Sequence, residues 1–326
     1  MGLGIRWRAE ALAREIRVKV ASKGPSPDIV ATGETEATEV DQYWNRHTIH
    51  TKPFVSARES EDYLRSRNAA YPKFVELMDL YGDHAGEVVL DYGCGPGDDV
   101  TGFLLWSKAR KVIGMDVSEK ALKLLRLRLA LHRVDTERVE LIRITDASGK
   151  IPLPDASVSW IQCGGVLHHT SHPHAIVKEF KRVLKPGGEG RLMLYNRDSV
   201  MYHVWIAYAQ MIVNNAFPGL TVDQAFTRST DGPDCPVSDA WASQRVLDMI
   251  AAGGLVGTFR GGYVSVMEID WLRQYGAAAK TDRRLADEHR NFISELVIDA
   301  LGLPMWRGKY AGIGGVYTIR KETAPN

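Results

Sequence analysis

The sequence predicts an α/β protein built on a parallel sheet with helices on both faces, and three observations support this fold class. From residue 87 onward, short apolar runs rich in β-branched residues alternate with segments whose apolar residues recur at helical spacing. The first run ends in a glycine-rich turn. An acidic residue lies at or near the end of each of the first three runs. Because parallel strands bring their carboxyl ends to one edge of a sheet, we expect the ligand site at that edge.

The composition is that of an ordinary soluble globular protein. The 326 residues are 44% hydrophobic and 25% charged, enough for one elaborated domain or two modest ones. A net charge of +1 provides no basic field for nucleic acid, which argues against an RNA or DNA substrate. Cys94, Cys163 and Cys235 form no C-x-x-C pair, so we expect a cytoplasmic protein. No apolar run approaches the ~20 residues of a membrane span.

The N-terminal part precedes the alternating pattern. Residues 1–20 have mixed charges and spaced apolar residues, which predict a surface helix, with contact to a partner or a membrane surface as the alternative. Residues 21–40 are polar and turn-prone, so residues 1–40 are interpreted as a helix and a flexible linker. Residues 41–84 predict a helical N-terminal cap that contains one helix over 60–82.

The alternating region predicts strands in chain order, separated by helices. Ser118 is placed to cap the helix over 118–133, and Pro173 to begin the helix that the residues 186–188 close. After Asn196 the rhythm breaks into a helix over 199–217 and a loop over 227–239, before a helix over 240–252 restores it. The predicted strands are 87–93, 111–117, 139–147, 158–165, 189–196, 255–267 and 314–321.

The strongest chemical signal is the G-x-G-x-G turn at residues 93–97, which directly follows a predicted strand. Glycine is needed where the backbone turns tightly and a ligand lies against it. Asp91 stands just ahead, able to orient the loop or to accept a hydrogen bond from a cationic ligand. Asp116, at the end of the second strand, is placed to bind the two hydroxyls of a ribose. Asp146 adds a third carboxylate along the same edge.

These motifs resemble the successive motifs of class I S-adenosylmethionine-dependent methyltransferases. The similar stretches are "VVLDYGCGPGDD", "VIGMDVS", "ITDA", "LPDASVSWIQCGGVLHHT" and "EFKRVLKPGGEGRLML", in the order and spacing of that family. The resemblance implies a doubly wound, mostly parallel, seven-stranded Rossmann-like sheet. It also implies that the last strand, in "GKYAGIGGVYTIRK", is antiparallel and lies between two others. Residues 85–326 would form this domain, with S-adenosylmethionine as the cofactor.

The resemblance also implies which residues bind the cofactor. The glycine turn would hold the methionine part, Asp116 the ribose, and Val117 would pack on the adenine. Asp146 and the backbone of Ala147 would read the adenine amino group. The complete implied set is Asp91, Gly93, Cys94, Gly95, Gly97, Asp116, Val117, Asp146, Ala147, Cys163, Gly164 and His169.

A nicotinamide dehydrogenase is the main competing interpretation of the glycine turn. Those enzymes use G-x-G-x-x-G, but here the third glycine comes one residue early. Asp98 and Asp99 follow it directly and would repel a pyrophosphate, whereas a sulfonium cofactor without phosphate tolerates them. The charge pattern therefore favours the methyltransferase interpretation.

The stretch "CGGVLHHTSHPH" holds four histidines after the fourth strand. His172 and His174 flank Pro173 at a helix start and point away from the strand end, so we predict no metal site. His168 and His169 lie where this family faces the methyl group. We interpret His168 as the general base, with a packing role beside the cofactor as the alternative.

The segment after the fifth strand, residues 197–237, is the predicted cover of the acceptor. Its polar and aromatic residues suit a small polar acceptor that an arginine recognises, although the arginines could instead form structural salt bridges. By family analogy, two aromatic residues of the N-terminal cap would close over the site. The predicted substrate-binding residues are Asn196, Arg197, Tyr202, His203, Arg228, Asp231, Tyr43 and Trp44.

The predicted function is methyl transfer to oxygen or nitrogen of a small molecule, such as a sugar or a natural-product intermediate. The absence of an N-P-P-Y-like tetrad after the fourth strand argues against a nucleobase or glutamine acceptor. A protein or RNA methyltransferase is one alternative. A non-catalytic S-adenosylmethionine-binding protein is another, and a homodimer remains open.

Overall fold

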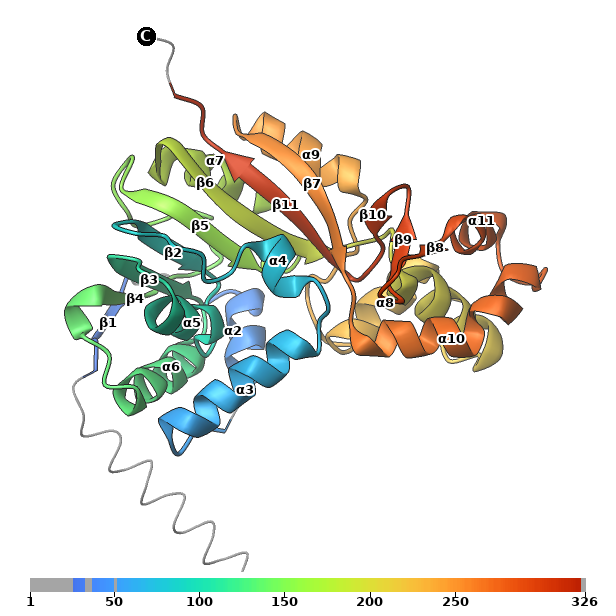
Figure 1. Ribbon diagram of the computed structural model, residues 1–326, viewed down its shortest axis with the longest axis horizontal. Helices are drawn as coiled ribbons and strands as arrows, with labels where there is room; N and C mark the ends of the chain where they lie inside the picture. Colours follow the sequence, from blue (N-terminus) through green and yellow to red (C-terminus); the bar gives the residue numbers. More distant parts are fainter. Residues whose placement is uncertain (1–25, 33–36, 50–51, 324–326) are drawn as a thin grey trace, which may run out of the picture.

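The computed structural model describes residues 26–32, 37–49 and 52–323, and its centre is an eight-stranded sheet (Figure 1). All neighbouring pairs from β1 to β6 are parallel, whereas β11 is antiparallel to both β6 and β7. This confirms the mostly parallel sheet and the antiparallel last strand between two others. Across the sheet the strands are β1 (Ile29–Ala31), β4 (Val139–Arg143), β3 (Lys111–Asp116), β2 (Val88–Tyr92), β5 (Val158–Gly164), β6 (Leu184–Tyr195), β11 (Gly314–Arg320) and β7 (Val256–Tyr263).

The prediction of seven strands is wrong by one, because β1 adds a strand at the edge of the sheet. β1 lies within residues 21–40, which were interpreted as a linker, and Ile29 pairs with Leu141 of β4. Thr32 continues the contact by donating its backbone and side-chain hydrogen bonds to the Arg143 carbonyl. An edge strand has unpaired backbone groups that a short segment can satisfy. Three residues are too few to show a strand period in the sequence.

Helices cover both faces of the sheet, as predicted, because successive strand residues point to opposite sides. Leu90 and Ile113 belong to the core formed with α7 and α9. Their neighbours Val89 and Val112 belong to the core formed with α5 and α6. The four helices are α5 (Asp98–Trp106), α6 (Glu119–Leu131), α7 (Pro173–Val183) and α9 (Ser243–Ala252).

The N-terminal cap consists of α2 (Glu39–Arg46), α3 (Ala57–Ala69) and α4 (Phe74–Met78). The single helix predicted over 60–82 is wrong, because the chain breaks between α3 and α4. Pro72 lacks a backbone donor and disfavours helical geometry in the residue before it, and Lys73 has a left-handed φ of 69°. The break directs α4 toward β6, β7 and β11, whereas α2 and α3 pack beside α6.

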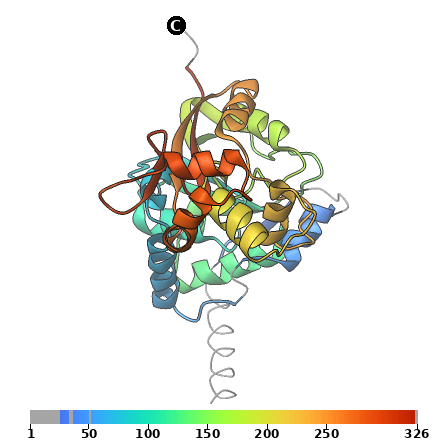
Figure 2. The same cartoon turned by 90° about the vertical axis from the view of Figure 1, so that its right-hand side faces the viewer.

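The segment after β6 forms a lobe beyond one end of the sheet (Figures 1 and 2). It begins with the π-helix η2 (Met201–Val213) and α8 (Val222–Thr230), which takes up part of the predicted loop over 227–239. Further elements after β7 pack on η2 and complete the lobe. They are α10 (Val266–Thr281), α11 (Asp287–Glu295) and a small antiparallel sheet of β8 (Val297–Ile298), β9 (Pro304–Trp306) and β10 (Lys309–Tyr310).

Some predictions about the chain as a whole are not decided by the fold. The helix predicted over residues 1–20 lies outside the described residues. The division into residues 1–40, 41–84 and 85–326 stays a prediction. Within the described part of the chain, no helix combines the length and the apolar character that a membrane span needs.

Candidate functional site

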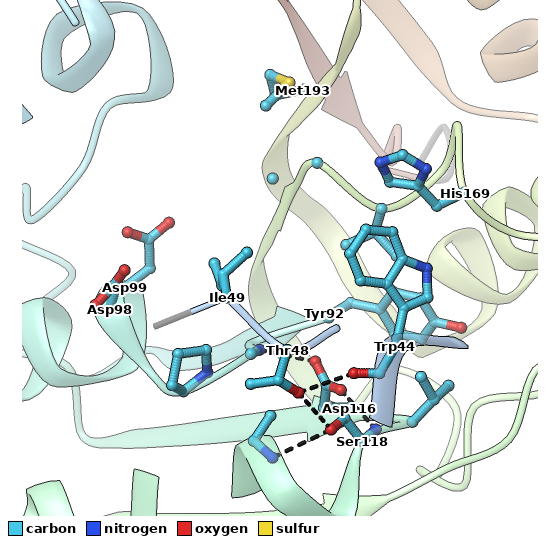
Figure 3. Close-up of a pocket in the computed structure, with 18 of the residues that line it drawn as sticks. Trp44, Thr48, Ile49, Tyr92, Asp98, Asp99, Asp116, Ser118, His169 and Met193 are labelled. Carbon is cyan, nitrogen blue, oxygen red and sulfur yellow. Dashed lines mark hydrogen bonds between the residues drawn. The ribbon is translucent and has the colours of Figure 1, made fainter. Parts of the chain in front are cut away.

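A cavity of about 540 Å³ lies at the carboxyl edge of the sheet, where the sequence predicts the ligand site (Figure 3). Its volume falls within the range of ~300–1,000 Å³ that small-molecule sites occupy. The glycine turn, the ends of β3 to β7 and all three helices of the cap contribute to its wall, together with residues 313 and 314 ahead of and at the start of β11. The cavity gathers several predicted cofactor residues: Gly93, Gly95, Asp116, Val117, Asp146, Gly164 and His169.

The glycine turn connects β2 to α5 and leaves space on its cavity side. At Gly95 (φ 52°) an added Cβ would meet only Ile49, at 4.0 Å, so a ligand can lie directly against the backbone. At Gly97 (φ 84°) an added Cβ would lie 2.0 Å from Leu125 of α6. Gly95 therefore serves the cavity, and Gly97 allows α6 to pack closely. Cys94 is buried and does not line the cavity.

Asp116, at the end of β3, is held by backbone donors on both of its oxygens. Gly95 N–H donates to Oδ2 and Ser118 N–H to Oδ1, each at 2.7 Å. Burial raises the pKa of Asp116 to about 6 despite these donors. Ser118 also contacts Thr48 of the cap at 2.8 Å, so the cap and the strand end meet at this carboxylate (Figure 3).

Asp91, in β2, is a buried carboxylate that does not line the cavity and has an unused acceptor. Its Oδ2 has no hydrogen-bond partner among the described residues. Burial and the neighbouring Asp99 raise its pKa well above the ordinary value. A buried acceptor without a partner is costly, so Asp91 suits a cationic donor.

Asp146 joins the end of β4 to the cap and to the loop after β5. Its side chain accepts hydrogen bonds from Thr170 Oγ1 and from Ser171 N–H, the latter at 3.0 Å. Its own N–H donates to Asp41 of α2 at 2.9 Å. Sequence reasoning missed Asp41, which also caps α2 through Thr38. Ala147 is exposed and lies outside the cavity wall.

The two predicted histidines at the pocket have different environments. His168, predicted as the base, is buried and does not line the cavity. Its Nδ1 accepts the Tyr195 N–H at 3.3 Å, and burial lowers its pKa well below the ordinary value. His169 lines the cavity beside Trp44, with ring centroids 4.8 Å apart (Figure 3). Adjacent residues point in different directions, so only one of the pair faces the ligand.

His169 belongs to a polar cluster at the middle of the cavity. Its Nδ1 lies 2.8 Å from the Val237 carbonyl, and its Nε2 lies 3.8 Å from Asp231 Oδ2. Tyr195 OH donates to Asp231 Oδ1 at 3.2 Å, and Ser238 Oγ donates to Oδ2 at 2.7 Å. Burial lowers the pKa of His169, while Asp231 partly offsets that effect. The ring is therefore neutral near pH 7 and has a carboxylate beside it.

Most of the predicted substrate residues do not reach the cavity. Trp44 and Asp231 line it, and Tyr43 lies behind the wall, where its hydroxyl donates to the Asp231 carbonyl. The rest make structural contacts in the lobe or lie on its surface. Asn196 donates to Gly312 O, Arg197 and Tyr202 contact Asp223, His203 contacts His289, and Arg228 is exposed. The side chain of Cys163 is likewise buried away from the cavity.

Sequence reasoning missed an aromatic and charged part of the wall that the cap supplies. Arg67 of α3 pairs with Asp99 at 2.6 Å and with Asp98 at 3.4 Å. Its guanidinium lies 4.8 Å from the ring centre of Phe74. The helical spacing of Tyr63 and Phe74 indicated only an apolar face, because that pattern does not distinguish a core from a cavity wall. The missed wall residues are Tyr63, Arg67, Tyr71, Phe74, Met193, Tyr195, Tyr263 and Ile313.

Among the residues that the structure describes, no group of three or more His, Cys, Asp or Glu side chains could hold a metal ion. His172 precedes α7 as its N-cap residue, and His174 is exposed in the first turn of that helix. Both therefore lie apart from His168 and His169.

Comparisons with known proteins identify one domain in the middle of the chain. Residues 90–191 match the family described as methyltransferase domain. An uncharacterized 37.1 kDa protein in transposon TN4556 of Streptomyces fradiae is 30% identical over 60% of this chain and 47% of its own length. A ubiquinone biosynthesis O-methyltransferase of Neisseria meningitidis serogroup A is 30% identical over 44% of this chain and 58% of its own. The chain thus spans about half the length of these relatives.

A solved structure shows the same fold at low identity. The Haemonchus contortus phosphoethanolamine N-methyltransferase 2, in complex with phosphomonomethylethanolamine and S-adenosylhomocysteine, superimposes with a TM-score of 0.51. The match has 11% identity and covers 88% of this chain and 61% of that one.

The residues at the glycine turn fit S-adenosylmethionine. The ribose of this cofactor has two hydroxyls, which can donate hydrogen bonds to a carboxylate such as Asp116. Its amino group can donate to an acceptor such as Asp91 Oδ2, which has no partner among the described residues. The open backbone at Gly95 permits close approach. Motif order and strand order agree with the match of residues 90–191 to the methyltransferase-domain family.

Proposed function

We propose that the protein transfers the methyl group of S-adenosylmethionine to an oxygen or nitrogen atom of a small-molecule acceptor. One observation carries this proposal: the cavity continues from the glycine turn past the ends of β5 and β6 to His169, Tyr195 and Asp231. A second ligand beside the cofactor would therefore meet polar groups within the same cavity. The name of the Neisseria relative, an O-methyltransferase, supports oxygen as the acceptor atom.

The cofactor supplies an activated methyl group on a sulfonium, so the protein contributes alignment and exclusion of water. The cap closes one side of the cavity through Trp44, Tyr63 and Phe74. Asp116 and the glycine turn hold the nucleoside and methionine parts in this proposal. His169 and Asp231 are then available to contact the acceptor.

The geometry favours His169 over His168 as the proton acceptor. The Val237 carbonyl accepts a hydrogen bond from Nδ1–H of His169, which leaves a lone pair on Nε2. After proton transfer, Asp231 at 3.8 Å would stabilise the imidazolium. His168 uses its Nδ1 to accept a backbone N–H, so its remaining nitrogen carries the proton and cannot act as a base.

The first experiment is calorimetry with S-adenosylmethionine and its demethylated product, followed by mass analysis of a panel of small acceptors, a protein digest and RNA. We expect cofactor binding and methylated product from the small acceptors. No binding of either cofactor form would refute the family assignment. Binding without any product would favour a non-catalytic binding protein, and product only from the digest or RNA would favour those alternatives.

The second experiment assigns the base. His169→Gln is expected to lower kcat about 100-fold, the usual contribution of a positioned base, and to leave cofactor affinity unchanged. The wild-type rate should fall with acid along a limb below the ordinary imidazole pKa of ~6.5, because burial lowers the pKa of His169. His174→Gln on the surface of α7 is the matched control. An unchanged kcat in His169→Gln would exclude this role.

Two further expectations belong with this proposal. We expect a reducing, cytoplasmic location, which agrees with three buried cysteines that form no disulfide. A homodimer stays a prediction that the oligomeric state in solution would test.

A further inference from the structure

The cavity has two halves that lie over different strands. The ends of β4, β3 and β2 carry Asp146, Asp116 and the glycine turn, which serve the cofactor. On the other side of β5, the wall comes from β6, β7 and the start of β11, together with the cap. Neighbouring strands lie ~4.8 Å apart, so β7 is roughly 19 Å from β2 along the sheet. This second half is the space available to an acceptor.

Three aromatic rings form the wall of the acceptor half. Phe74 and Tyr263 pack edge to face with centroids 4.8 Å apart, and Tyr71 lies 5.6 Å from Tyr263 and 6.2 Å from Phe74. Tyr71 and Phe74 come from the cap, and Tyr263 from the end of β7. Met193 and Ile313 add apolar surface on the strand side. Such a surface favours a flat, apolar ligand that stacks against or packs edge to face with the rings.

The charges beside the Phe74 ring are already paired with one another. Arg67 binds Asp99 and Asp98, and the buried Arg128 also binds Asp98. The Arg67 guanidinium already lies 4.8 Å from the Phe74 ring centre. An acceptor carrying a cation would therefore meet a positive charge where it would need an open aromatic face. An anionic acceptor would have to compete with two carboxylates for Arg67.

The polar end of the acceptor half is the cluster of His169, Tyr195 and Asp231. A neutral imidazole is a weak base, and it suits a hydroxyl that is already acidic. A phenol has an ordinary pKa of ~10, as in tyrosine. The pKa of a phenol is therefore much closer to that of an imidazolium than the pKa of a sugar hydroxyl is. The strength of the base and the shape of the wall therefore select the same acceptor chemistry.

We propose that the acceptor is a neutral, planar aromatic compound with a phenolic hydroxyl, whose ring lies against Tyr71, Phe74 and Tyr263 while the hydroxyl faces His169. This inference rests on the proposed methyltransferase function. The phenol O–H bond breaks and its proton goes to His169 Nε2, while the oxygen forms a bond to the methyl carbon. The carbon–sulfur bond breaks and its electron pair stays on sulfur. The products are an aryl methyl ether, S-adenosylhomocysteine and an imidazolium that returns its proton to water.

The test compares 2-naphthol with decahydro-2-naphthol, which has the same carbon skeleton and hydroxyl but no planar ring. Binding of each to the full chain loaded with S-adenosylhomocysteine is measured by calorimetry. We expect 2-naphthol to bind about tenfold more tightly, because only the planar ring can use the aromatic wall. Incubation with S-adenosylmethionine should then give 2-methoxynaphthalene.

Variants of the wall locate the binding site. Phe74→Leu and, as a second variant, Tyr71→Leu should each weaken 2-naphthol about fivefold and leave S-adenosylmethionine affinity unchanged. Phe259→Leu, on β7 but outside the cavity wall, is the matched control and should change neither. Unchanged 2-naphthol affinity in both wall variants would overturn the inference.

The remaining outcomes separate this inference from the proposed function. Equal binding of the two naphthol forms, or transfer only to amines or sugars, would overturn the aromatic acceptor and leave the methyltransferase function intact. Failure to bind S-adenosylmethionine, or no transfer to any acceptor class, would instead overturn the proposed function.

Discussion

The cofactor half and the acceptor half of the cavity are held in place by different means. In the cofactor half, backbone groups of neighbouring strand ends are bound directly to carboxylates, as with Gly95 and Ser118 on Asp116. In the acceptor half, side chains from the cap, β6, β7 and the lobe pack together. Their positions depend on elements that are far apart in the sequence. The cofactor half is held mainly by hydrogen bonds at the strand ends, whereas the acceptor half is held mainly by the packing of side chains. Each half should therefore respond to its own substitutions.

Glu268 connects the lobe to the acceptor half through hydrogen bonds. This buried carboxylate accepts hydrogen bonds from the N–H groups of Met201, Ser265 and Ile313 at 3.0, 2.8 and 3.2 Å. It thereby joins the start of η2, the start of α10 and a residue of the cavity wall. Ser265 and Glu268 also form a capping box for α10, whose sequence signature is S-x-x-E.

Glu268→Ala is expected to give the largest effect. The substitution leaves three backbone donors without an acceptor, and we expect the free energy of unfolding to fall by about 4 kcal/mol. Urea denaturation measures this change. Glu268→Gln keeps a side-chain oxygen acceptor and should lose about half as much. A loss below ~1 kcal/mol in the alanine variant would show that the lobe does not depend on this contact.

Asp116→Ala tests the cofactor half alone. The substitution removes the proposed acceptor for the ribose hydroxyls, and two hydrogen bonds to a charged group are together worth about 3 kcal/mol. We expect the Kd for S-adenosylmethionine to rise about 100-fold. Glu119→Ala, which removes a half-buried carboxylate paired with Lys123, is the matched control. Unchanged cofactor affinity would contradict the proposed ribose contact, and folding is checked by thermal unfolding.

The same contrast explains which parts were predictable from the sequence. The cofactor half lies within residues 88–147 and follows strand ends in chain order, so a local motif and the strand period locate its groups. Parallel strands then bring these groups together without any knowledge of distant packing. Asp116 and the glycine turn lie on the cavity for this reason. Asp41 was missed because its partner Asp146 is 105 residues away.

The acceptor half could not be predicted in the same way. Arg197 and Arg228 follow β6 in the chain, which suggested a cover over the site, yet one contacts Asp223 and the other is exposed. The wall instead uses Phe74 and Tyr263, which are far apart in the sequence. The break at Pro72 turns α4 toward β7 and makes that contact. A three-residue edge strand such as β1 also lies below the length at which a pattern can be recognised.

The smallest expected effect is a pH dependence of cofactor binding, which the cofactor half should control and the acceptor half should not. Burial raises the pKa of Asp116 to about 6, so protonation would remove the proposed acceptor of the ribose hydroxyls when the pH falls through that value. The Kd for S-adenosylmethionine should therefore be constant above pH 7 and rise below pH 6 by at most about tenfold per pH unit. Calorimetry between pH 5 and 8 measures this. Asp116→Asn should bind weakly with a flat profile, whereas His169→Gln should keep the wild-type profile because its imidazole acts on the acceptor. A flat profile in the wild-type protein would mean that the ionised form of Asp116 does not bind the cofactor.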